Sequence, residues 1–403
     1  MVTKNLIHSG HLIDSGQLTI ILNLIIESGA DYEIKRFDVG KTPANESTMQ
    51  LLLKAEDEIL LEVTAAKLTP FGVRAVGESD GIWLEVTRDM AAPEDFYSTT
   101  NHRTEVFYGG QWRLLSHQRM DAAVVKTEDG PVCTKLRDLR AGDQVLIGAT
   151  SIRVSPPEVS GGTDTFAFMN NHVSSERNAT GAALKVAGEM TAIRERGGKI
   201  VVVAGPVVVH TGGADALAEL VADGWVGGLL GGNAIAVHDL EYRLFGTSLG
   251  VDLSTGRPTY EGHKNHMMAI NAVYRHGSIK KLVDSGELKE GLMYQIIRTG
   301  TPYCLAGSIR DDGPLPETEM DMIAAQGAYA DIVAGSDMIL MLSTMLHSIG
   351  TGNMTPSWVK TVCVDINPAV VTKLSDRGSA QTVGVVSDVG LFLRALAGEL
   401  GKT

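Results

Sequence analysis

The chain has 403 residues, of which 44% are hydrophobic and 21% are charged, and its net charge is −13. A chain of this length can bury the cores of two or three domains, and its acid excess argues against a nucleic-acid or anionic-membrane surface, which needs a basic face. The N-terminal run MVTKNLIHSGHLIDSG lacks the apolar core of a signal peptide and no apolar run approaches transmembrane length, so the expected location is cytoplasmic.

Residues 1–80 predict a small α+β domain of the ferredoxin-like type. The apolar run Leu18–Ser28 predicts a helix, YEIKRFDVG follows it, and a second helix is expected near Ser47–Asp57. EILLEVTAAKLTPFGV then predicts another β/α element.

Residues 81–160 predict a β-rich, barrel-like segment. Its short runs, punctuated by Gly and Asp, are GIWLEVT, TEVFYGGQWRLL, DAAVVKT and DQVLIGATSIRVS. SPPEVSGGTD (Ser155–Asp164) then interrupts regular structure with two prolines and two glycines, which predicts a domain boundary near residue 160.

Residues 161–403 predict a doubly wound, mostly parallel sheet, because six strand-like runs alternate with helical segments. The first, KIVVVAG, is continuously apolar, as expected for a parallel strand that is buried on both faces. The others are GWVGGLLGG, PYCLAGS, DMILML, TVCVDI and TVGVVS. Cys304 and Cys363 lie in these apolar runs and, with Cys133, share no CxxC spacing, which favours buried reduced thiols.

Two of these strands end in an acid, Asp365 and Asp388, just before a helical segment. The carboxyl ends of parallel strands face the ligand crevice, where an acid commonly accepts hydrogen bonds from ribose hydroxyls. The sequence therefore predicts a bound dinucleotide, although no GxGxxG follows any strand.

Three other strand-end turns carry candidate binding residues. In LLGGNAIAVHDLE, Gly231–Gly232 permit close backbone approach, and Asn233–Ala234 open a helix with N–H groups available to a phosphate. LAGSIRDDGPLPE places Asp311 and Asp312 after a strand, and STMLHSIGTGNM places His347 as a base or hydrogen-bond partner to the cofactor. The alternative is that these are ordinary βα turns, solvated acids and a core histidine.

The run FYSTTNHRTE concentrates aromatic, hydroxyl, amide, imidazole and guanidinium groups. It predicts a polar substrate site that includes Asn101 and His102, with Arg103 holding a carboxylate. An ordinary polar hairpin is the alternative.

The run EGHKNHMMAINAVYRH contains His263, Lys264, His266 and His276. The HxxH spacing suggests a metal site, but no carboxylate or cysteine stands at the proper offset, so no metal is predicted. Lys264 near a nicotinamide would act as a base or orient an α-carboxylate, and the alternative is a solvated lysine on a helix face.

The chain resembles the archaeal-type ornithine cyclodeaminase family, which is also described as a conserved domain associated with lysine-ketoglutarate reductase/saccharopine dehydrogenase. The sheet domain of that family looks like the NAD-binding fold of deoxyhypusine synthase, which would explain the missing GxGxxG. The matching runs, spread over nearly the whole chain, are GHLIDSG (Gly10–Gly16), FYSTTNH (Phe96–His102), AGSIRDDGPLP (Ala306–Pro316), TMLHSI (Thr344–Ile349) and CVDINPAVVTKLSDRGS (Cys363–Ser379).

The resemblance implies an NAD-dependent, redox-neutral conversion of L-ornithine to L-proline and ammonia, in a homo-oligomer that is a dimer or a tetramer. An α-imine would form, the δ-amino group would attack it, ammonia would leave, and bound NADH would reduce the cyclic imine. The NAD contacts implied on matching positions are Asn233, Ala234, Asp312, Thr344, Met345, Leu346, His347, Asp365, Asp388 and Val389.

The catalytic base is not assigned by the resemblance. Residue type and expected loop position favour Lys264, then His102, then Asp121. Two other functions stay open, a net NAD-dependent oxidoreductase of the saccharopine or lysine type, which would accumulate NADH, and a nucleotide or amino-acid sensor.

Overall fold

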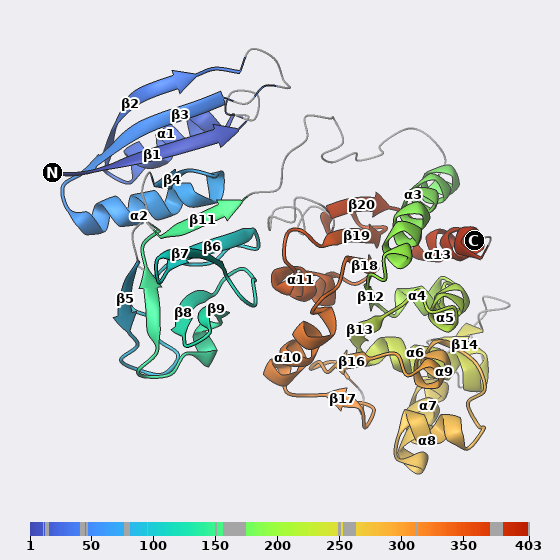
Figure 1. Cartoon of the computed structure of the whole chain (residues 1–403). Coiled ribbons are helices and arrows are strands. Elements are labelled where there is room, and N and C mark those ends of the chain that lie inside the picture. Colours follow the sequence, from blue (N-terminus) through green and yellow to red (C-terminus); the bar gives the residue numbers. More distant parts are fainter. Residues whose placement is uncertain are drawn as a thin grey trace. The chain divides into compact units, whose positions relative to one another are not determined.

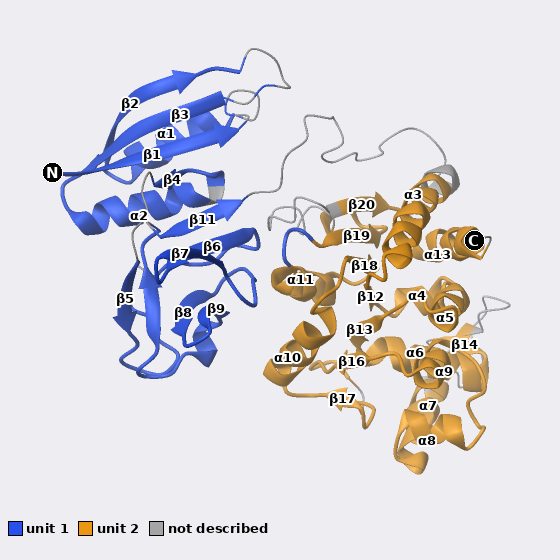
Figure 2. Ribbon diagram, viewed as in Figure 1, with its two compact units in different colours: residues 1–163, 356–358 blue, residues 164–355, 359–403 orange. Residues whose placement is uncertain are grey.

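The chain forms two compact units, which are coloured separately in Figure 2. The first contains Met1–Thr163 and Pro356–Trp358, and the second contains Asp164–Thr355 and Val359–Thr403. The residues described by this computed structural model are 1–10, 12, 16–40, 45, 47–75, 81–94, 96–149, 151–155, 175–248, 251–252, 263–311, 313–370 and 382–401.

The first unit begins with a four-stranded antiparallel sheet in the order β2-β3-β1-β4. Buried side chains of the two helices, Ile21 and Ile25 in one and Leu61 and Leu68 in the other, share one core with the strands. The βαββαβ order with this strand order is the ferredoxin-like arrangement. Its elements are β1 (Val2–Gly10), α1 (Gln17–Glu27), β2 (Asp31–Asp38), β3 (Ser47–Ala55), α2 (Glu58–Leu68), the 3₁₀ helix η1 (Thr69–Phe71) and β4 (Arg74–Ala75).

The helix expected near Ser47–Asp57 is wrong, because Ser47–Ala55 is the strand β3. Met49, Leu51 and Leu53 are buried at every second position, which is strand periodicity. Leu, Met and Lys favour helices locally, but β3 pairs with β1 on one side and β2 on the other, and this pairing overrides local propensity. The helix starts only after Asp57, whose carboxylate accepts a hydrogen bond from Leu60 N at 2.8 Å.

The β-rich segment follows, with two antiparallel sheets in the orders β5-β10-β8-β9 and β11-β6-β7. They share a core around Val106, Val124, Leu146 and Ile152. One strand, β9, was not expected from the sequence. The predicted divisions at residues 80 and 160 fall outside the described residues, as does SPPEVSGGTD after Ser155, so both divisions stay predictions. The elements are β5 (Ile82–Glu85), β6 (Arg103–Tyr108), β7 (Gln111–Leu114), β8 (Ala123–Thr127), β9 (Gly130–Thr134), η2 (Leu136–Asp138), β10 (Gln144–Ile147) and β11 (Ile152–Ser155).

The second unit is built on a seven-stranded parallel sheet in the order β17-β16-β13-β12-β18-β19-β20. All six expected strands are present, and the short β17 joins them at one edge. Its strands are β12 (Ile200–Ala204), β13 (Gly228–Gly232), β16 (Tyr303–Ala306), β17 (Thr318–Glu319), β18 (Met338–Leu342), β19 (Lys360–Asp365) and β20 (Thr382–Val386), with the small hairpin β14 (Thr247–Ser248) and β15 (Val251–Asp252) apart from the sheet.

Helices cover both faces of this sheet (Figure 1). Alternate residues of β12 serve the two cores: Val202 packs with the large helical group, whereas Val201 and Val203 pack with α10 and α11. This explains why the strand is continuously apolar. The helices are α3 (Ser175–Glu195), α4 (Val207–His210), α5 (Ala214–Ala222), α6 (Asn233–Phe245), α7 (His263–His276), α8 (Ile279–Asp284), α9 (Leu292–Thr299), α10 (Met322–Val333), α11 (Met345–Met354) and α13 (Val389–Leu400).

The strand order places a topological switch point beside β12. From β12 the chain moves outward through β13, β16 and β17, and then returns to the other side of β12 with β18. Ligands of open α/β sheets bind outside the carboxyl ends of the strands at such a point. Within the described ranges, no helix combines the length and apolar character needed to span a bilayer.

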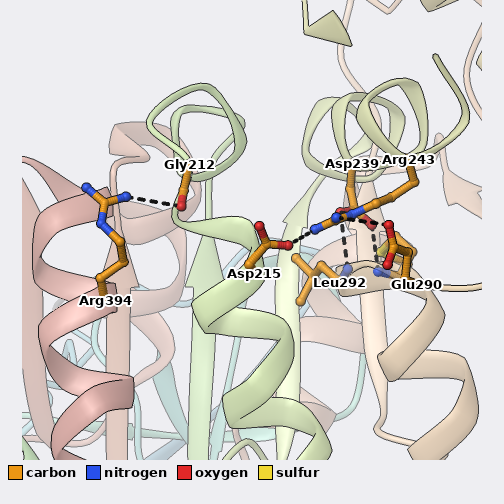
Figure 3. A network of polar contacts seen from close by, with 8 residues as sticks. Gly212, Asp215, Asp239, Arg243, Glu290, Leu292 and Arg394 are labelled. Atoms are coloured by element: carbon orange, nitrogen blue, oxygen red, sulfur yellow. Dashed lines mark hydrogen bonds and ion pairs between the residues drawn. The ribbon is translucent and has the colours of Figure 1, made fainter. Parts of the chain in front are cut away.

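A buried carboxylate on α6 fixes the N-terminus of α9 (Figure 3). Asp239, fully buried on α6, accepts hydrogen bonds from Leu292 N at 3.1 Å and Met293 N at 2.8 Å, the first N–H groups of α9. Burial raises the pKa of Asp239 to about 6, while these two bonds act to lower it. Arg243 lies 3.8 Å from Asp239 and also contacts the exposed Asp215.

Replacing Asp239 by alanine is expected to lower the free energy of unfolding by about 2–4 kcal/mol, because two buried N–H groups lose their acceptor. Asp215→Ala removes one exposed partner of Arg243, which keeps the exposed Glu290 at 3.6 Å, and is expected to cost less than about 1 kcal/mol. Urea unfolding of both variants measures the difference. Equal small losses would show that the N-terminus of α9 does not depend on this carboxylate.

Candidate functional site

A cavity of about 310 Å³ opens at the carboxyl ends of the central strands. Four strand-end segments contribute to it, those after β12, β13, β16 and β18. Its position is therefore the ligand crevice expected from the strand order. The lining residues are Pro206, Gly232, Asn233, Ala234, Ala306, Ser308, Arg310, Asp311, Thr344, Leu346 and His347.

The start of α6 forms one wall. The backbone of Gly232 is extended, with φ −81°. A Cβ at this position would lie 2.8 Å from His347 Nε2, so a larger residue would displace the imidazole. The buried Asn233 accepts hydrogen bonds through Oδ1 from Leu315 N at 3.0 Å and Thr318 Oγ1 at 2.9 Å. The asparagine thus ties the long loop after β16 to the helix start, where backbone N–H groups can face an anion.

His347 forms a second wall and is held by Tyr329 of α10. The Tyr329 hydroxyl donates to Gly231 O at 2.8 Å and lies 3.0 Å from His347 Nδ1. Because that hydroxyl has a single proton, His347 Nδ1–H donates to it, and Nε2 keeps its lone pair. Burial lowers the pKa of His347, so the neutral ring presents a hydrogen-bond acceptor beside Gly232.

The turn between β18 and α11 is held in an uncommon backbone conformation. Ser343 has φ 47°, in the left-handed region, and its N–H donates to Val364 O at 2.9 Å. A Cβ on Gly205 would lie 2.3 Å from Ser343 O, so the segment after β12 approaches this turn closely. The strained turn directs Thr344 and the first turn of α11 to the cavity, and such strain is typical of functional sites.

The loop after β16 brings one charge of each sign. Asp311 accepts from Ser308 N at 2.7 Å and from Ser308 Oγ at 3.1 Å, which closes a tight local turn. Arg310 and Asp311 both line the cavity, so the loop offers a guanidinium for a phosphate and a carboxylate for a hydroxyl. Asp312 lies outside the described residues.

Five predicted cofactor residues line the cavity, namely Asn233, Ala234, Thr344, Leu346 and His347. Met345 is exposed in the first turn of α11. The other three lie at the ends of the next two strands: Asp365 accepts from Asn367 N at 2.8 Å, and Asp388 caps α13, which begins at Val389, by accepting from Leu391 N at 2.8 Å.

The residues predicted from FYSTTNHRTE belong to the first unit. Asn101 is buried there and its backbone carbonyl accepts from Ser357 N at 2.8 Å, while His102 is half-buried and Arg103 is exposed at the start of β6. Burial lowers the pKa of His102, whose Nδ1 makes no hydrogen bond. Asp121 is exposed in a left-handed turn, with φ 57°.

Part of the hydroxyl density in this run has a structural role. Thr99 Oγ1 donates to Arg119 O at 2.7 Å and accepts from Ala122 N at 3.1 Å. Thr99 thus supports the polar-hairpin alternative, whereas Asn101, His102, Arg103 and Asp121 stay candidates.

Lys264 lies in the first turn of α7, where its side chain is exposed. Tyr329, whose hydroxyl contacts the cavity residue His347, was not predicted from the sequence. In the sequence it resembles an ordinary buried residue of a helix. Only its hydrogen bond to His347, on a different helix, reveals its role.

A seven-stranded doubly wound sheet with a cavity at its switch point defines a Rossmann-type α/β protein. Three family models cover the chain: the LOR/SDH bifunctional enzyme conserved region over residues 3–102, the first C-terminal region of arginine dihydrolase ArgZ-like proteins over 103–182, and their C-terminal Rossmann fold over 184–396. The chain belongs to this ArgZ-like and ornithine cyclodeaminase family, which confirms the resemblance.

Relatives include the bifunctional arginine dihydrolase/ornithine cyclodeaminase ArgZ of Synechocystis sp., 50% identical over 97% of this chain and 57% of the relative. An ornithine cyclodeaminase of Methanocaldococcus jannaschii is 46% identical over 98% of this chain and 95% of the relative. Among solved structures, the ternary complex of AgrE with ornithine and NAD⁺ is 46% identical over all of this chain and 58% of that chain, with a TM-score of 0.55. The chain thus spans little more than half of the bifunctional proteins.

Replacing Tyr329 by phenylalanine is expected to lower the free energy of unfolding by about 1–3 kcal/mol, because Gly231 O and His347 Nδ1–H both lose a buried partner. With the imidazole no longer held in one tautomer, NAD⁺ affinity is expected to fall roughly tenfold. Urea unfolding and calorimetric titration measure the two effects. Tyr294→Phe, on α9 and not in the cavity, is the control, and equal behaviour of both variants would rule out this role for Tyr329.

Proposed function

We propose that this protein is an NAD-dependent ornithine cyclodeaminase, which converts L-ornithine to L-proline and ammonia without net oxidation. The observation that carries the proposal is the cavity at the strand ends, whose lining includes five of the residues that the resemblance implies as NAD contacts. The AgrE complex with ornithine and NAD⁺ supports the same pair of ligands here.

The cavity residues suit a dinucleotide without a GxGxxG turn. Gly232 and the N-terminus of α6 would receive a phosphate, with Arg310 supplying a positive charge. His347 Nε2 would accept a hydrogen bond from a hydroxyl or amide of the cofactor. Asp365 and Asp388, at the ends of β19 and β20, would receive ribose hydroxyls, as would Asp312 in the loop after β16.

When bound, NAD⁺ accepts the hydride of the substrate α-carbon and later returns it to the ring carbon, so the cofactor is unchanged after one turnover. Loss of the α-hydride and of a proton from the α-amine gives an imine. The δ-amino nitrogen then adds to the imine carbon, and the bond between that carbon and the original α-nitrogen breaks to release ammonia. The product of that step is a cyclic imine. Water must be excluded, because it would hydrolyse both imines.

Protein groups are needed to take the proton from the α-amine and to return one to the leaving ammonia. We propose Lys264 for this role, with His102 and Asp121 as the next candidates. Asn101 and Arg103 are proposed to bind the substrate, with Arg103 holding the α-carboxylate. We also propose that the protein is a homo-oligomer. We propose a cytoplasmic location as well, because the three cysteines are free thiols, which a reducing compartment maintains.

Incubation of the purified protein with L-ornithine and NAD⁺ tests the proposal. The expected result is proline and ammonia in equal amounts, with no accumulation of NADH absorbance. Reaction of ornithine labelled with deuterium at the α-carbon is expected to retain the label at the same carbon of proline, because the hydride that leaves is the one that returns.

A net oxidoreductase acting on a related amino acid is the second candidate, and the LOR/SDH region over residues 3–102 favours it. It would instead produce NADH steadily and no proline. A protein that binds NAD⁺ and ornithine but forms neither product would be a sensor, and the cyclodeaminase proposal would then be wrong.

A further inference from the structure

A polar cluster lies between α6 and α7, inside an otherwise apolar core. Glu241 is fully buried and His238 is 5% exposed, both on α6, and His266 of α7 faces them with 23% of its side chain exposed. Ala234, which lines the cavity, is four residues before His238, and Glu241 is three residues after it, so the three share one helix face. The cluster therefore lies along α6, beyond the cavity.

The three side chains converge on a common point. His238 Nδ1 lies 3.3 Å from Glu241 Oε2, and His266 Nδ1 lies 3.5 Å from the same oxygen. One ligand atom from each residue lies within 4.8 Å of the other two. In addition, His266 Nδ1 is a buried nitrogen without a hydrogen bond.

The spacing distinguishes between possible occupants. Ligand bonds of about 2.0–2.1 Å in tetrahedral geometry place neighbouring ligand atoms about 3.3 Å apart, close to the two observed distances. An ammonium group with hydrogen bonds of about 2.8 Å would place its acceptors about 4.6 Å apart. Direct imidazole–carboxylate hydrogen bonds would be about 2.7–2.9 Å long. The two separations from Glu241 Oε2 to the imidazole nitrogens, 3.3 and 3.5 Å, match those expected around a small cation.

Neighbouring groups hold the carboxylate in this orientation. Thr247 Oγ1 donates to Glu241 Oε1 at 2.9 Å, and Asn265 Nδ2 donates to Thr247 Oγ1 at 2.9 Å. These bonds hold Oε1 of the carboxylate, and Oε2 lies 3.3 and 3.5 Å from the two imidazole nitrogens. Such outer hydrogen bonds are the usual means by which proteins orient metal ligands.

The imidazole of a third histidine, His210, packs against the cluster. His210, at the end of α4, packs edge-on against His238 with 4.7 Å between ring centroids, and its Nδ1 lies 2.6 Å from Ser248 Oγ. His210 therefore packs beside the three converging atoms and does not belong to the ligand set.

We propose that His238 Nδ1, Glu241 Oε2 and His266 Nδ1 bind a divalent transition metal ion of the zinc class. Two imidazoles and one carboxylate suit Zn²⁺ or Co²⁺, whereas Ca²⁺ and Mg²⁺ prefer sites made only of oxygen. The ion would neutralise the buried carboxylate and clamp α7 to α6. Since His266 is two residues from Lys264, it would also fix the helix turn that carries Lys264.

Metal binding by the full-length protein tests the proposal. After chelator treatment and dialysis, titration with Zn²⁺ is expected to give about one bound equivalent per chain and a higher melting temperature, and Co²⁺ is expected to give the visible bands of a tetrahedral site. Glu241→Gln and His266→Ala are expected to weaken binding at least about 100-fold. His276→Ala changes a half-buried histidine of the same helix that pairs with Glu287, and this control is expected to keep full binding.

Absence of stoichiometric Zn²⁺ binding by the chelated wild type would overturn the proposal, as would equal binding by the wild type and His266→Ala. If Glu241→Gln does not fold, His266→Ala decides alone, since its ring is partly exposed. Proline formation and NAD⁺ binding are measured separately on the same samples. The metal proposal can therefore be wrong while the proposed function is right, and the proposed function can be wrong while the metal proposal is right.

Discussion

Replacing Gly232 by alanine is expected to lower NAD⁺ affinity by about 100-fold, with the fold unchanged. The backbone at Gly232 is extended, so alanine adopts it without strain. The added Cβ would lie 2.8 Å from His347 Nε2 and 3.5 Å from Cε1, so it pushes the imidazole from the place where Tyr329 holds it. The methyl group also occupies part of the cavity next to the start of α6.

Gly327→Ala is the matched control, because a Cβ on this helical glycine of α10 meets no atom within 4 Å. It is expected to bind NAD⁺ normally and to be slightly more stable, since alanine favours helices over glycine. Calorimetric titration with NAD⁺ and thermal unfolding compare the two variants. Normal affinity in Gly232→Ala would show that the cofactor does not use this part of the cavity.

Replacing Lys264 by methionine is expected to reduce proline formation by at least about 1,000-fold, because it removes the group that we propose to transfer protons at the substrate amine. NAD⁺ affinity is expected to stay within about threefold of the wild type, since Lys264 is not among the residues that line the cavity. Methionine keeps the length of the side chain and the apolar part of its contacts.

Lys280→Met controls for loss of a surface charge, because Lys280 is exposed on α8 and pairs with Asp284 of the same helix at 2.6 Å. Steady-state assays of proline and ammonia, with NAD⁺ titrations of the same preparations, measure both effects. Full activity in Lys264→Met would remove this residue from the mechanism. His102→Asn and Asp121→Asn would then be the variants to assay.

The cavity could be located largely from the sequence. Parallel strands that are buried on both faces have continuously apolar sequences, as the β12 sequence shows. The residues that follow such strands lie together at one edge of the sheet. Asn233, His347, Asp365 and Asp388 were therefore recognisable as candidates from their positions alone. The family resemblance added Thr344, Met345, Leu346 and Val389. The carboxylates of Asp365 and Asp388 accept local backbone hydrogen bonds in this structure.

The strand β3 shows where local reading fails. Its run STMQLLLKA contains good helix formers, and its alternation of buried positions becomes visible only when the partners on both sides are known. The register with β1 and β2 places Met49, Leu51 and Leu53 on the core face. Strand pairing of this kind is a property of distant segments, which no single window of sequence contains.

The sequence by itself determined the parallel sheet, the edge of the sheet where the cavity lies and the family, because each of these depends on short continuous runs. Only the tertiary structure decided which side chains act together. Tyr329 reaches Gly231 across 98 positions and sets the tautomer of His347, and α6 supplies His238 and Glu241 to a histidine of α7. Those contacts arise from helix packing on a common sheet, and packing depends on the whole fold at once.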